Sequence, residues 1–322
     1  MLTCGHVNLL ISVLLVVHLS LIGQLGQRQM MPRHHHRNAQ IKMRPDNNEK
    51  LSSQPLADSV AQTVAESRTI KTDSMEPRIP VAARSLLTIL KHQLRDLISE
   101  SLNTVQSHDV LSTTQAQARV LIALKRGNVS VGEPPDEGYI DEEAWNLPYL
   151  YGDIYNITLK QPAGLHDVIV ATMTIGVCCG RDTSFYLFQK RGACWVLTLT
   201  QEANGYAQID GAQGMFDCRI APLDHAGHLF VVTTNVNPWC TSNWQRLRYC
   251  VMRIGARPEK PQVLKRSAET IYLGVDNPYQ LRAAQGNFSL DFEGDSNPDE
   301  IHCRHHLTYR INNTGAHLLR KD

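Results

Sequence analysis

The first 138 residues of this 322-residue chain contain no phenylalanine, tyrosine or tryptophan. All the aromatic residues (6 Phe, 10 Tyr and 4 Trp) lie at or after Tyr139, and seven of the 8 cysteines lie after residue 177. Aromatic side chains supply much of the apolar area of a protein core, so the N-terminal part has little from which to build a dense core of its own. We therefore place the main folded domain at residues 139–322.

Neither sign of charge is in excess. The chain has 32 basic and 31 acidic residues, which gives a net charge of +1. A nucleic-acid-binding surface needs an excess of Lys and Arg, so we expect no nucleic-acid partner. The sequence also lacks a Walker loop, a dinucleotide-binding glycine motif, H-E-x-x-H and G-x-S-x-G, which mark several large enzyme classes. These absences leave the enzyme question open but favour a protein without catalytic activity.

Residues 1–26 are typical of a signal peptide or a membrane anchor. The run 9–23 is apolar apart from two serines and one histidine, which suits a signal-peptide core and is short for a full membrane span. No Lys or Arg precedes this run and several follow it, a distribution that favours keeping the downstream part in the cytoplasm. The cysteine content favours export, so we predict an extracytoplasmic protein, periplasmic or secreted, with residues 9–23 as a membrane tether if they are retained. Translation from Met30 or Met31 would instead give a cytosolic protein.

Residues 27–79 are polar, contain several prolines and show no sustained hydrophobic period. This composition predicts a flexible, disordered linker that tethers the rest of the chain. Within it, residues 57–68 have the pattern of a short helix. Three consecutive histidines at 34–36 are an alternative metal-binding tract, which we interpret as part of an unstructured tail.

Residues 80–127 predict an α-helical hairpin. Leucine, isoleucine and valine recur at three- and four-residue steps from Leu86 to Val105, which is the period of an amphipathic helix. Ser112 begins a capping box for a second helix, and Gly127 suits the C-terminal end of that helix. We expect the apolar faces of both helices to dock on the downstream domain of the same chain.

The domain 139–322 contains a unit of roughly sixty residues that occurs three times, at about 153–210, 214–273 and 278–322. Glycines recur as pairs 28, 28 and 29 residues apart: Gly164 and Gly192, Gly227 and Gly255, and Gly286 and Gly315. Strand-like segments flank each glycine, so each copy predicts an antiparallel meander of four strands. The predicted fold class is therefore mainly β, with the meanders arranged as propeller blades or as a sandwich. Three copies are fewer than the four blades that the smaller closed propellers have.

Seven cysteines remain if the N-terminal segment is removed, and most lie near predicted turns. Cys240 and Cys250 flank one predicted hairpin loop, and Cys179 and Cys194 flank the equivalent loop one repeat earlier. We therefore predict two disulfides, Cys240–Cys250 and Cys179–Cys194. The odd number leaves one thiol unpaired or paired between chains. Zinc ligation and a redox-active pair are the alternatives, although the adjacent Cys178 and Cys179 do not form a C-x-x-C motif.

We expect no cofactor, with calcium as the alternative. The candidate metal ligands alternate along one acidic loop: Asp291, Glu293, Asp295, Asn297 and Asp299. Calcium binds six to eight oxygen ligands on flexible loops, but Asp and Asn are also ordinary residues of a solvated turn. The following run His-Cys-Arg-His-His at 302–306 contains zinc ligands. Alternation along a strand would put no three of them on one face, so we interpret these histidines as exposed.

Trp239 and Trp244 flank a short turn and are the candidate ligand-binding residues. Two indole rings can present a flat apolar surface to a sugar or a peptide, and alternatively they cover the predicted disulfide. Asp167, Asp291 and Glu293 occupy similar positions in their repeats, so they are the candidate catalytic carboxylates of a hydrolase. Ordinary polar turns explain these three residues equally well.

Together these patterns predict an extracytoplasmic binding or structural protein built on a β-repeat domain, with a glycan or another protein as its ligand. The first alternative is a secreted hydrolase whose carboxylates converge from the repeat loops. The second alternative is a cytosolic interaction protein that starts at Met30 or Met31.

Overall fold

The structure of the protein is a computed structural model, and it describes residues 53–70, 77–104, 113–132, 151–177, 180–223, 228–237, 243–294 and 303–322. Within these ranges three helices precede antiparallel strands that form two sheets. The predicted fold class, mainly β with antiparallel meanders after helices, is confirmed. The predicted signal or anchor segment 1–26, with its apolar run 9–23, and the alternative starts Met30 and Met31 lie outside the described residues.

The helices are α1 (Gln54–Ser67), α2 (Val81–Asn103) and α3 (Thr113–Arg126). Helices α2 and α3 match the two expected in 80–127, and α1 matches the short helix expected near 57–68. Helix α1 buries Ala57, Val60 and Val64, one stripe of its surface, and it packs on α2. The final part of the predicted tether is therefore folded, and the expected hairpin is a layer of three helices. None of the described helices combines the length and apolar character needed to span a membrane.

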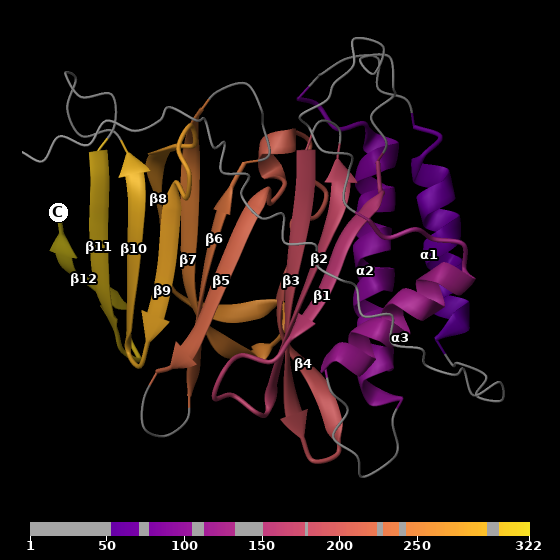
Figure 1. The fold of residues 1–322 in the computed structure, drawn as a ribbon, viewed down its shortest axis with the longest axis horizontal. Helices are drawn as coiled ribbons and strands as arrows, with labels where there is room; N and C mark the ends of the chain where they lie inside the picture. Colours follow the sequence, from indigo (N-terminus) through magenta and orange to yellow (C-terminus); the bar gives the residue numbers. More distant parts are fainter. Residues whose placement is uncertain are drawn as a thin grey trace, which may run out of the picture. The chain divides into compact units, whose positions relative to one another are not determined.

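The first sheet has four strands in chain order: β1 (Ile154–Lys160), β2 (Val168–Val177), β3 (Gly180–Arg191) and β4 (Cys194–Gln201). A connecting segment with the 3-10 turn η2 (Ile209–Gly211) leads to the second sheet. That sheet contains β5 (Met215–Pro222), β6 (Leu229–Val236), β7 (Trp244–Arg257), β8 (Lys260–Tyr272), β9 (Tyr279–Ala284), β10 (Asn287–Gly294), β11 (Cys303–Ile311) and β12 (Ala316–Lys321). Figure 1 shows these elements in colours that follow the sequence.

Each predicted repeat folds as a four-stranded meander, but the second and third meanders belong to one sheet. Strand β10 pairs with β9 and β11, and at the single position Gly294 it also pairs with Ile271 of β8. Strand β5 lies against β9, so a separate apolar core is enclosed between these two meanders. In the described part of the chain the three repeats therefore form two sheets rather than three independent blades.

The first glycines of the first and third pairs occupy matching turns. Of the second glycines, Gly192 lies between β3 and β4 with a φ of 63°, whereas Gly255 does not lie in a turn. Gly164, between β1 and β2, has a φ of 76°, and Gly286, between β9 and β10, has a φ of 65°. Both values lie in the left-handed region that favours glycine. Gly227 lies outside the described residues. Gly255, expected at a turn, lies inside β7, where a Cβ atom would be 2.2 Å from the backbone oxygen of Lys260.

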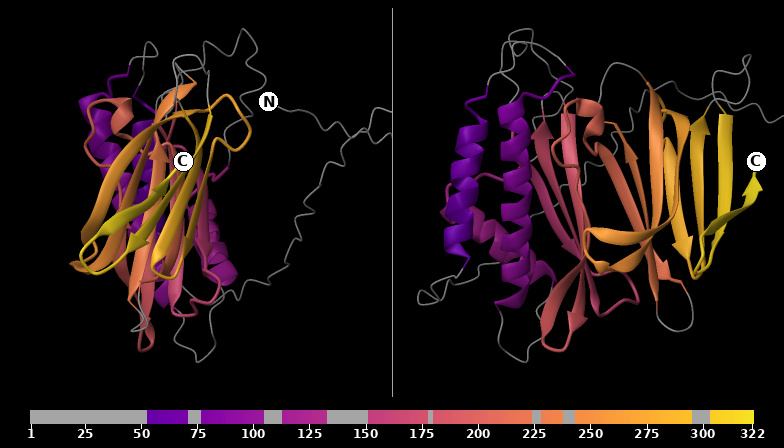
Figure 2. Two further views of the ribbon diagram at one scale, coloured as in Figure 1. Left: turned by 90° about the vertical axis from the view of Figure 1, so that its left-hand side faces the viewer. Right: turned by 180° about the vertical axis from the view of Figure 1, so that it is seen from behind.

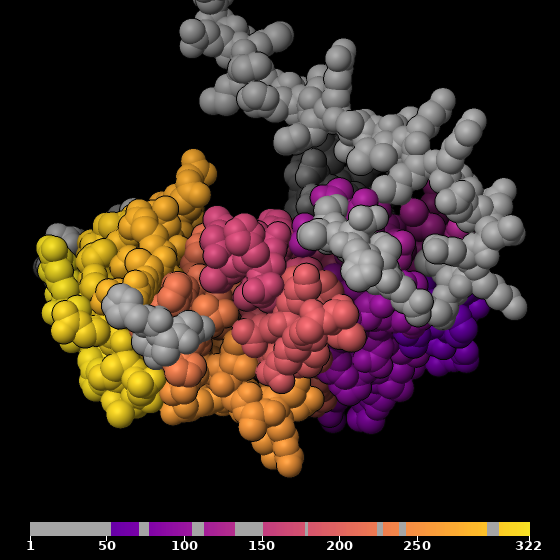
Figure 3. Space-filling view, turned by 90° about the horizontal axis from the view of Figure 1, so that it is seen from below, coloured from indigo at the N-terminus to yellow at the C-terminus, as the bar shows by residue number. Residues whose placement is uncertain are grey.

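Apolar side chains fill both sides of the first sheet. The three helices cover one side, and strands β6 and β7 cover part of the other, as the views from two further directions show (Figure 2). Strand β2 is apolar along almost its whole length, which is the pattern expected of a strand buried on both faces. The space-filling view shows the first sheet, in pink and red, between the helices and the second sheet (Figure 3).

A buried ion pair crosses the layer between α2 and the first sheet. The side chains of Lys91 in α2 and Asp182 in β3 are both 0% exposed and are hydrogen-bonded to each other. Lys91 also donates to the backbone oxygen of Ala203, while Asp182 accepts from the Tyr206 hydroxyl at 2.7 Å and from the backbone N–H of Gln213 at 3.1 Å. The helical period places Lys91 beside the apolar stripe, and its burial is tolerated because these partners surround both charges.

We predict that Lys91→Met lowers the free energy of unfolding by about 3–5 kcal/mol, because it leaves the buried Asp182 carboxylate without a countercharge. Urea unfolding followed by circular dichroism measures this change. The control is Lys125→Met at an exposed position of α3, which should change the stability by less than about 0.5 kcal/mol. Equal effects of the two substitutions would contradict the assigned role of the ion pair.

We also predict that Gly255→Ala destabilises the protein by about 1–3 kcal/mol through overpacking. The added methyl group would meet backbone rather than a flexible side chain, and it lies near the β7–β8 turn, where Pro258 accepts a hydrogen bond of 2.9 Å from Thr200 of β4. Gly132→Ala is the control, because nothing lies within 4 Å of the position that its added methyl group would occupy. Thermal unfolding should separate the two variants, and a stable Gly255→Ala protein would refute the steric argument.

Candidate functional site

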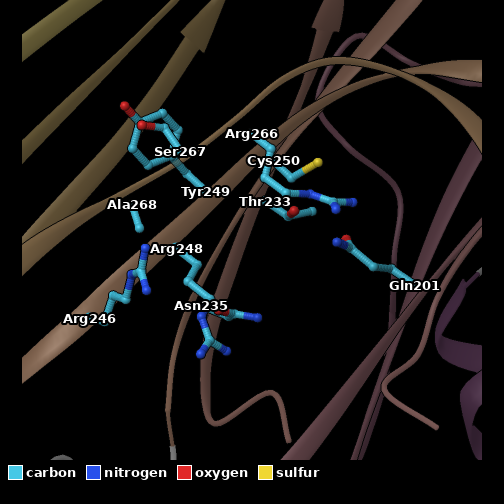
Figure 4. A pocket seen from close by; sticks show the side chains of 10 residues that line it. All are labelled: Gln201, Thr233, Asn235, Arg246, Arg248, Tyr249, Cys250, Arg266, Ser267 and Ala268. Atoms are coloured by element: carbon cyan, nitrogen blue, oxygen red, sulfur yellow. The ribbon is translucent and has the colours of Figure 1, made fainter. Parts of the chain in front are cut away.

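A pocket of about 370 Å³ opens between the end of β4 and one region of strands β6, β7 and β8 (Figure 4). Gln201, the last residue of β4, forms one side of it. The other lining residues come from the second sheet: Thr233, Asn235, Arg246, Arg248, Tyr249, Cys250, Arg266, Ser267 and Ala268. We call this cavity the arginine pocket.

The strand register explains why these polar side chains meet. Two alternate rows of paired residues cross β6, β7 and β8, namely Thr233–Cys250–Arg266 and Asn235–Arg248–Ala268. Side chains two residues apart on a strand share a face, so both rows and Arg246 lie on the same side of the sheet. Tyr249 alternates to the opposite side, where its hydroxyl is 2.8 Å from that of Tyr309.

The charge in this pocket has one sign. Among the ten lining residues that the structure describes, three are arginine and none is aspartate or glutamate. Arg248 donates from Nη1 to the backbone oxygen of Asp210 at 3.0 Å, which ties its guanidinium to the connecting segment. Arg246 and Arg266 are exposed. Because guanidinium groups stay protonated in proteins, the pocket is positively charged and suits an anion.

Cys250 is the only thiol among the lining residues, and it is buried. Burial raises the pKa of the Cys250 thiol above its ordinary value, and the neighbouring Arg266 only partly opposes this rise. A thiol with a raised pKa is a poor nucleophile, so the pocket contains no activated cysteine. Cys250 lies inside β7 and is not part of a disulfide in the structure. The predicted partner Cys240 lies outside the described residues, and that pairing stays a prediction.

The second predicted disulfide, Cys179–Cys194, is incompatible with strand β3. Cys179 lies outside the described residues but is covalently joined to Gly180, the first residue of β3. Cys194, an exposed free thiol, pairs with Arg191 at the other end of this 12-residue strand. At about 3.3 Å per residue, the two ends are separated by far more than the roughly 7 Å between Cα atoms that a disulfide allows. The length of β3 between Gly180 and Arg191, which sequence spacing did not reveal, is the physical reason.

Trp244 is the first residue of β7, and its ring packs on its cross-strand partner Tyr272 with ring centroids 5.0 Å apart. Trp239 lies outside the described residues. Trp244 lines neither this pocket nor a second one at the β1–β2 turn. The predicted sugar- or peptide-binding role of the two tryptophans therefore stays a prediction.

The candidate catalytic carboxylates are not brought together. Asp291 and Glu293 share the outer face of β10, where Asp291 accepts from Arg282 at 2.5 Å and Glu293 accepts from Arg304 at 3.0 Å. Asp167 is exposed at the start of β2 in the other sheet, where it lines the second pocket, of about 400 Å³. Neither pocket contains Asp291 or Glu293. The expected convergence of the three carboxylates is wrong, because the repeats do not surround a common centre.

The predicted calcium loop is described only in part, since Asp295, Asn297 and Asp299 lie outside the described residues. Within the residues that the structure describes, no three His, Cys, Asp or Glu side chains are grouped to hold a metal ion. In the run 302–306, Cys303 and His305 share one face with Sγ and Nε2 3.3 Å apart, and His305 stacks on Phe292. His302 lies outside the described ranges.

One constellation resembles a nucleophilic triad but does not form a pocket. The Asp291 carboxylate is hydrogen-bonded to Nδ1 of His306, and Nε2 of His306 lies 2.7 Å from the Thr308 hydroxyl. The groups follow the carboxylate, imidazole and hydroxyl order of hydrolases. Thr308 nevertheless lies within β11, which is paired with strands on both sides, and neither described pocket includes it. We interpret the hydrogen-bonded series Asp291, His306 and Thr308 as part of the paired charges on the outer face of the sheet.

The sequence analysis did not predict the arginine pocket, although part of the residue pattern that forms it can be read in the sequence. Arg246 and Arg248 alternate with apolar residues in a strand-like segment, and such spacing puts two cations on one face. Arg266 joins them only because β8 pairs with β7 in one particular register. Gln201 comes from a different sheet, and no local pattern predicts its position.

We predict that Cys194 reacts with iodoacetamide at pH 7.5 much faster than Cys250, because only Cys194 is exposed and the pKa of Cys250 is raised by burial. Peptide mass mapping after timed alkylation measures both rates. In urea the two cysteines should react at similar rates, which controls for sequence effects. Equal rates in the native protein would contradict the burial of Cys250.

The arginine pocket is thus the described cavity with the most distinctive chemistry, since it combines three cations with no carboxylate. The comparisons with known proteins add no assignment to it. No family model, no curated protein and no solved structure matches the chain.

Proposed function

We propose that the protein is a binding protein for a small anion and that the arginine pocket is its binding site. The observation that carries this proposal is the presence of three guanidinium groups on adjacent strands in one cavity, with no carboxylate among its described lining residues. Arginine binds carboxylate, phosphate and sulfate groups through paired hydrogen bonds in a fixed planar geometry. A ligand with such a group would offset the mutual repulsion of the three cations.

Two further properties favour binding over catalysis. The cavity volume of about 370 Å³ lies within the range of roughly 300–1,000 Å³ that is usual for small-molecule sites. The part of the lining that the structure describes contains neither a carboxylate nor an imidazole for proton transfer, and the pKa of its thiol, Cys250, is raised. We further propose, from the apolar run 9–23 and the cysteine content, that binding takes place outside the cytoplasm.

We predict that at least one of inorganic phosphate, sulfate and citrate binds the full-length protein in isothermal titration calorimetry at low ionic strength. Arg266→Gln should raise the dissociation constant by about tenfold or more, because a charge-assisted hydrogen bond contributes about 1.5–3 kcal/mol. Binding should also weaken as salt is added.

The matched control is Arg257→Gln, which removes the same charge from an exposed position of β7 outside the pocket. This variant should bind like the unmodified protein. Absence of binding by all three anions, or equal losses in the two variants, would refute the proposed function.

A further inference from the structure

The arginine pocket contains hydrogen-bond acceptors as well as cations. Oε1 of Gln201 and Oδ1 of Asn235 are buried, and neither has a hydrogen-bond partner within the described residues. Figure 4 shows Gln201 on one side of the pocket and Asn235 among the strands on the other. A buried amide oxygen without a partner is unfavourable, so each position would gain from a donor supplied by a ligand.

The two sets of groups demand different features of that ligand. Guanidinium groups only donate hydrogen bonds, so they require an anionic acceptor, whereas the oxygens of Gln201 and Asn235 require a donor. An ammonium donor would be repelled by the three arginines, whereas a neutral donor such as a hydroxyl is compatible with this charge.

We propose that the ligand is a small hydroxylated anion of the sugar-phosphate or sugar-acid type, whose charged group contacts the arginines while its hydroxyls donate to Gln201 and Asn235. This inference rests on the proposed function and adds the class of ligand to it. The cavity, of about 370 Å³, is at the lower end of the usual range for small-molecule sites, which suits a compact ligand.

A matched pair of compounds tests the hydroxyl requirement. Glycerol 3-phosphate and n-propyl phosphate carry the same phosphate on the same three-carbon chain and differ in two hydroxyl groups. In calorimetric titrations of the full-length protein, glycerol 3-phosphate should bind about tenfold more tightly, which corresponds to hydrogen bonds formed only by the hydroxylated compound.

The variant Gln201→Met, similar in size but without the amide, should bring the affinity ratio of the two compounds closer to one. Gln262→Met, at an exposed position of β8 outside the pocket, is the control and should keep the ratio. Thermal unfolding checks that both variants fold. If Gln201→Met does not fold, the ratio of the two affinities in the unmodified protein still tests the hydroxyl requirement.

The outcomes separate the two proposals. If both compounds bind equally well, the hydroxyl requirement is wrong and the anion-binding function stands. If neither compound binds and phosphate, sulfate and citrate also fail, the proposed function itself is wrong. An affinity ratio that stays high in Gln201→Met, or that falls equally in Gln201→Met and Gln262→Met, would overturn the assigned contact with Gln201.

Discussion

The buried pair of Lys91 and Asp182 fixes the segment through which the chain passes from the first sheet to the second. Lys91 holds the backbone oxygen of Ala203 just after β4, and Asp182 holds the backbone N–H of Gln213 just before β5. Between these two points the backbone oxygen of Asp210 accepts from Arg248. The segment that begins directly after Gln201 is thus anchored to a helix, to a strand and to a pocket arginine. Because two charges at 0% exposure are stable only when fully surrounded by partners, this arrangement permits little displacement of either pocket wall.

The composition along β6 and β7 decides where the two sheets pack and where they leave a cavity. Near one end of the shared face, Leu229, Val231 and Met252 contact the apolar side chains of the first sheet and exclude water. The next pair on the same face, Thr233 and Cys250, combines a hydroxyl with a thiol of the apolar cluster. Beyond it, Asn235 and Arg248 face each other in register. Charged and amide groups resist burial without partners, so the interface remains open at this point. The same strands therefore provide both the packing that joins the sheets and the pocket that we assign to an anion.

Local patterns predicted the parts of the fold that depend on neighbouring residues, and they failed where distant residues meet. The period of three to four in α2 and the apolar character of β2 were sufficient to place a helix and a strand buried on both faces. Nothing near Lys91 indicates its partner Asp182, which lies 91 residues away. Gly255 has the spacing of a turn glycine but is required by close approach of a neighbouring strand. The pocket was missed for the same reason, since its lining depends on the β7–β8 register and on the entry of Gln201 from the other sheet.

Two groups of charged residues on strand faces can be compared within the described residues, and their difference favours a ligand at one of them. On the outer face of β9, β10 and β11, the carboxylates of Asp291 and Glu293 each have an arginine partner, so the charges balance within the sheet. In the pocket, Arg246, Arg248 and Arg266 face a cavity without a carboxylate in its lining. Like charges on adjacent strands destabilise a sheet. The pairs of opposite charges on the outer face would therefore stabilise the fold more than a cluster of arginines does. A bound anion would offset the cost of the unbalanced cluster, which is the physical reason for proposing the pocket, rather than the more conspicuous acidic and histidine residues, as the functional site.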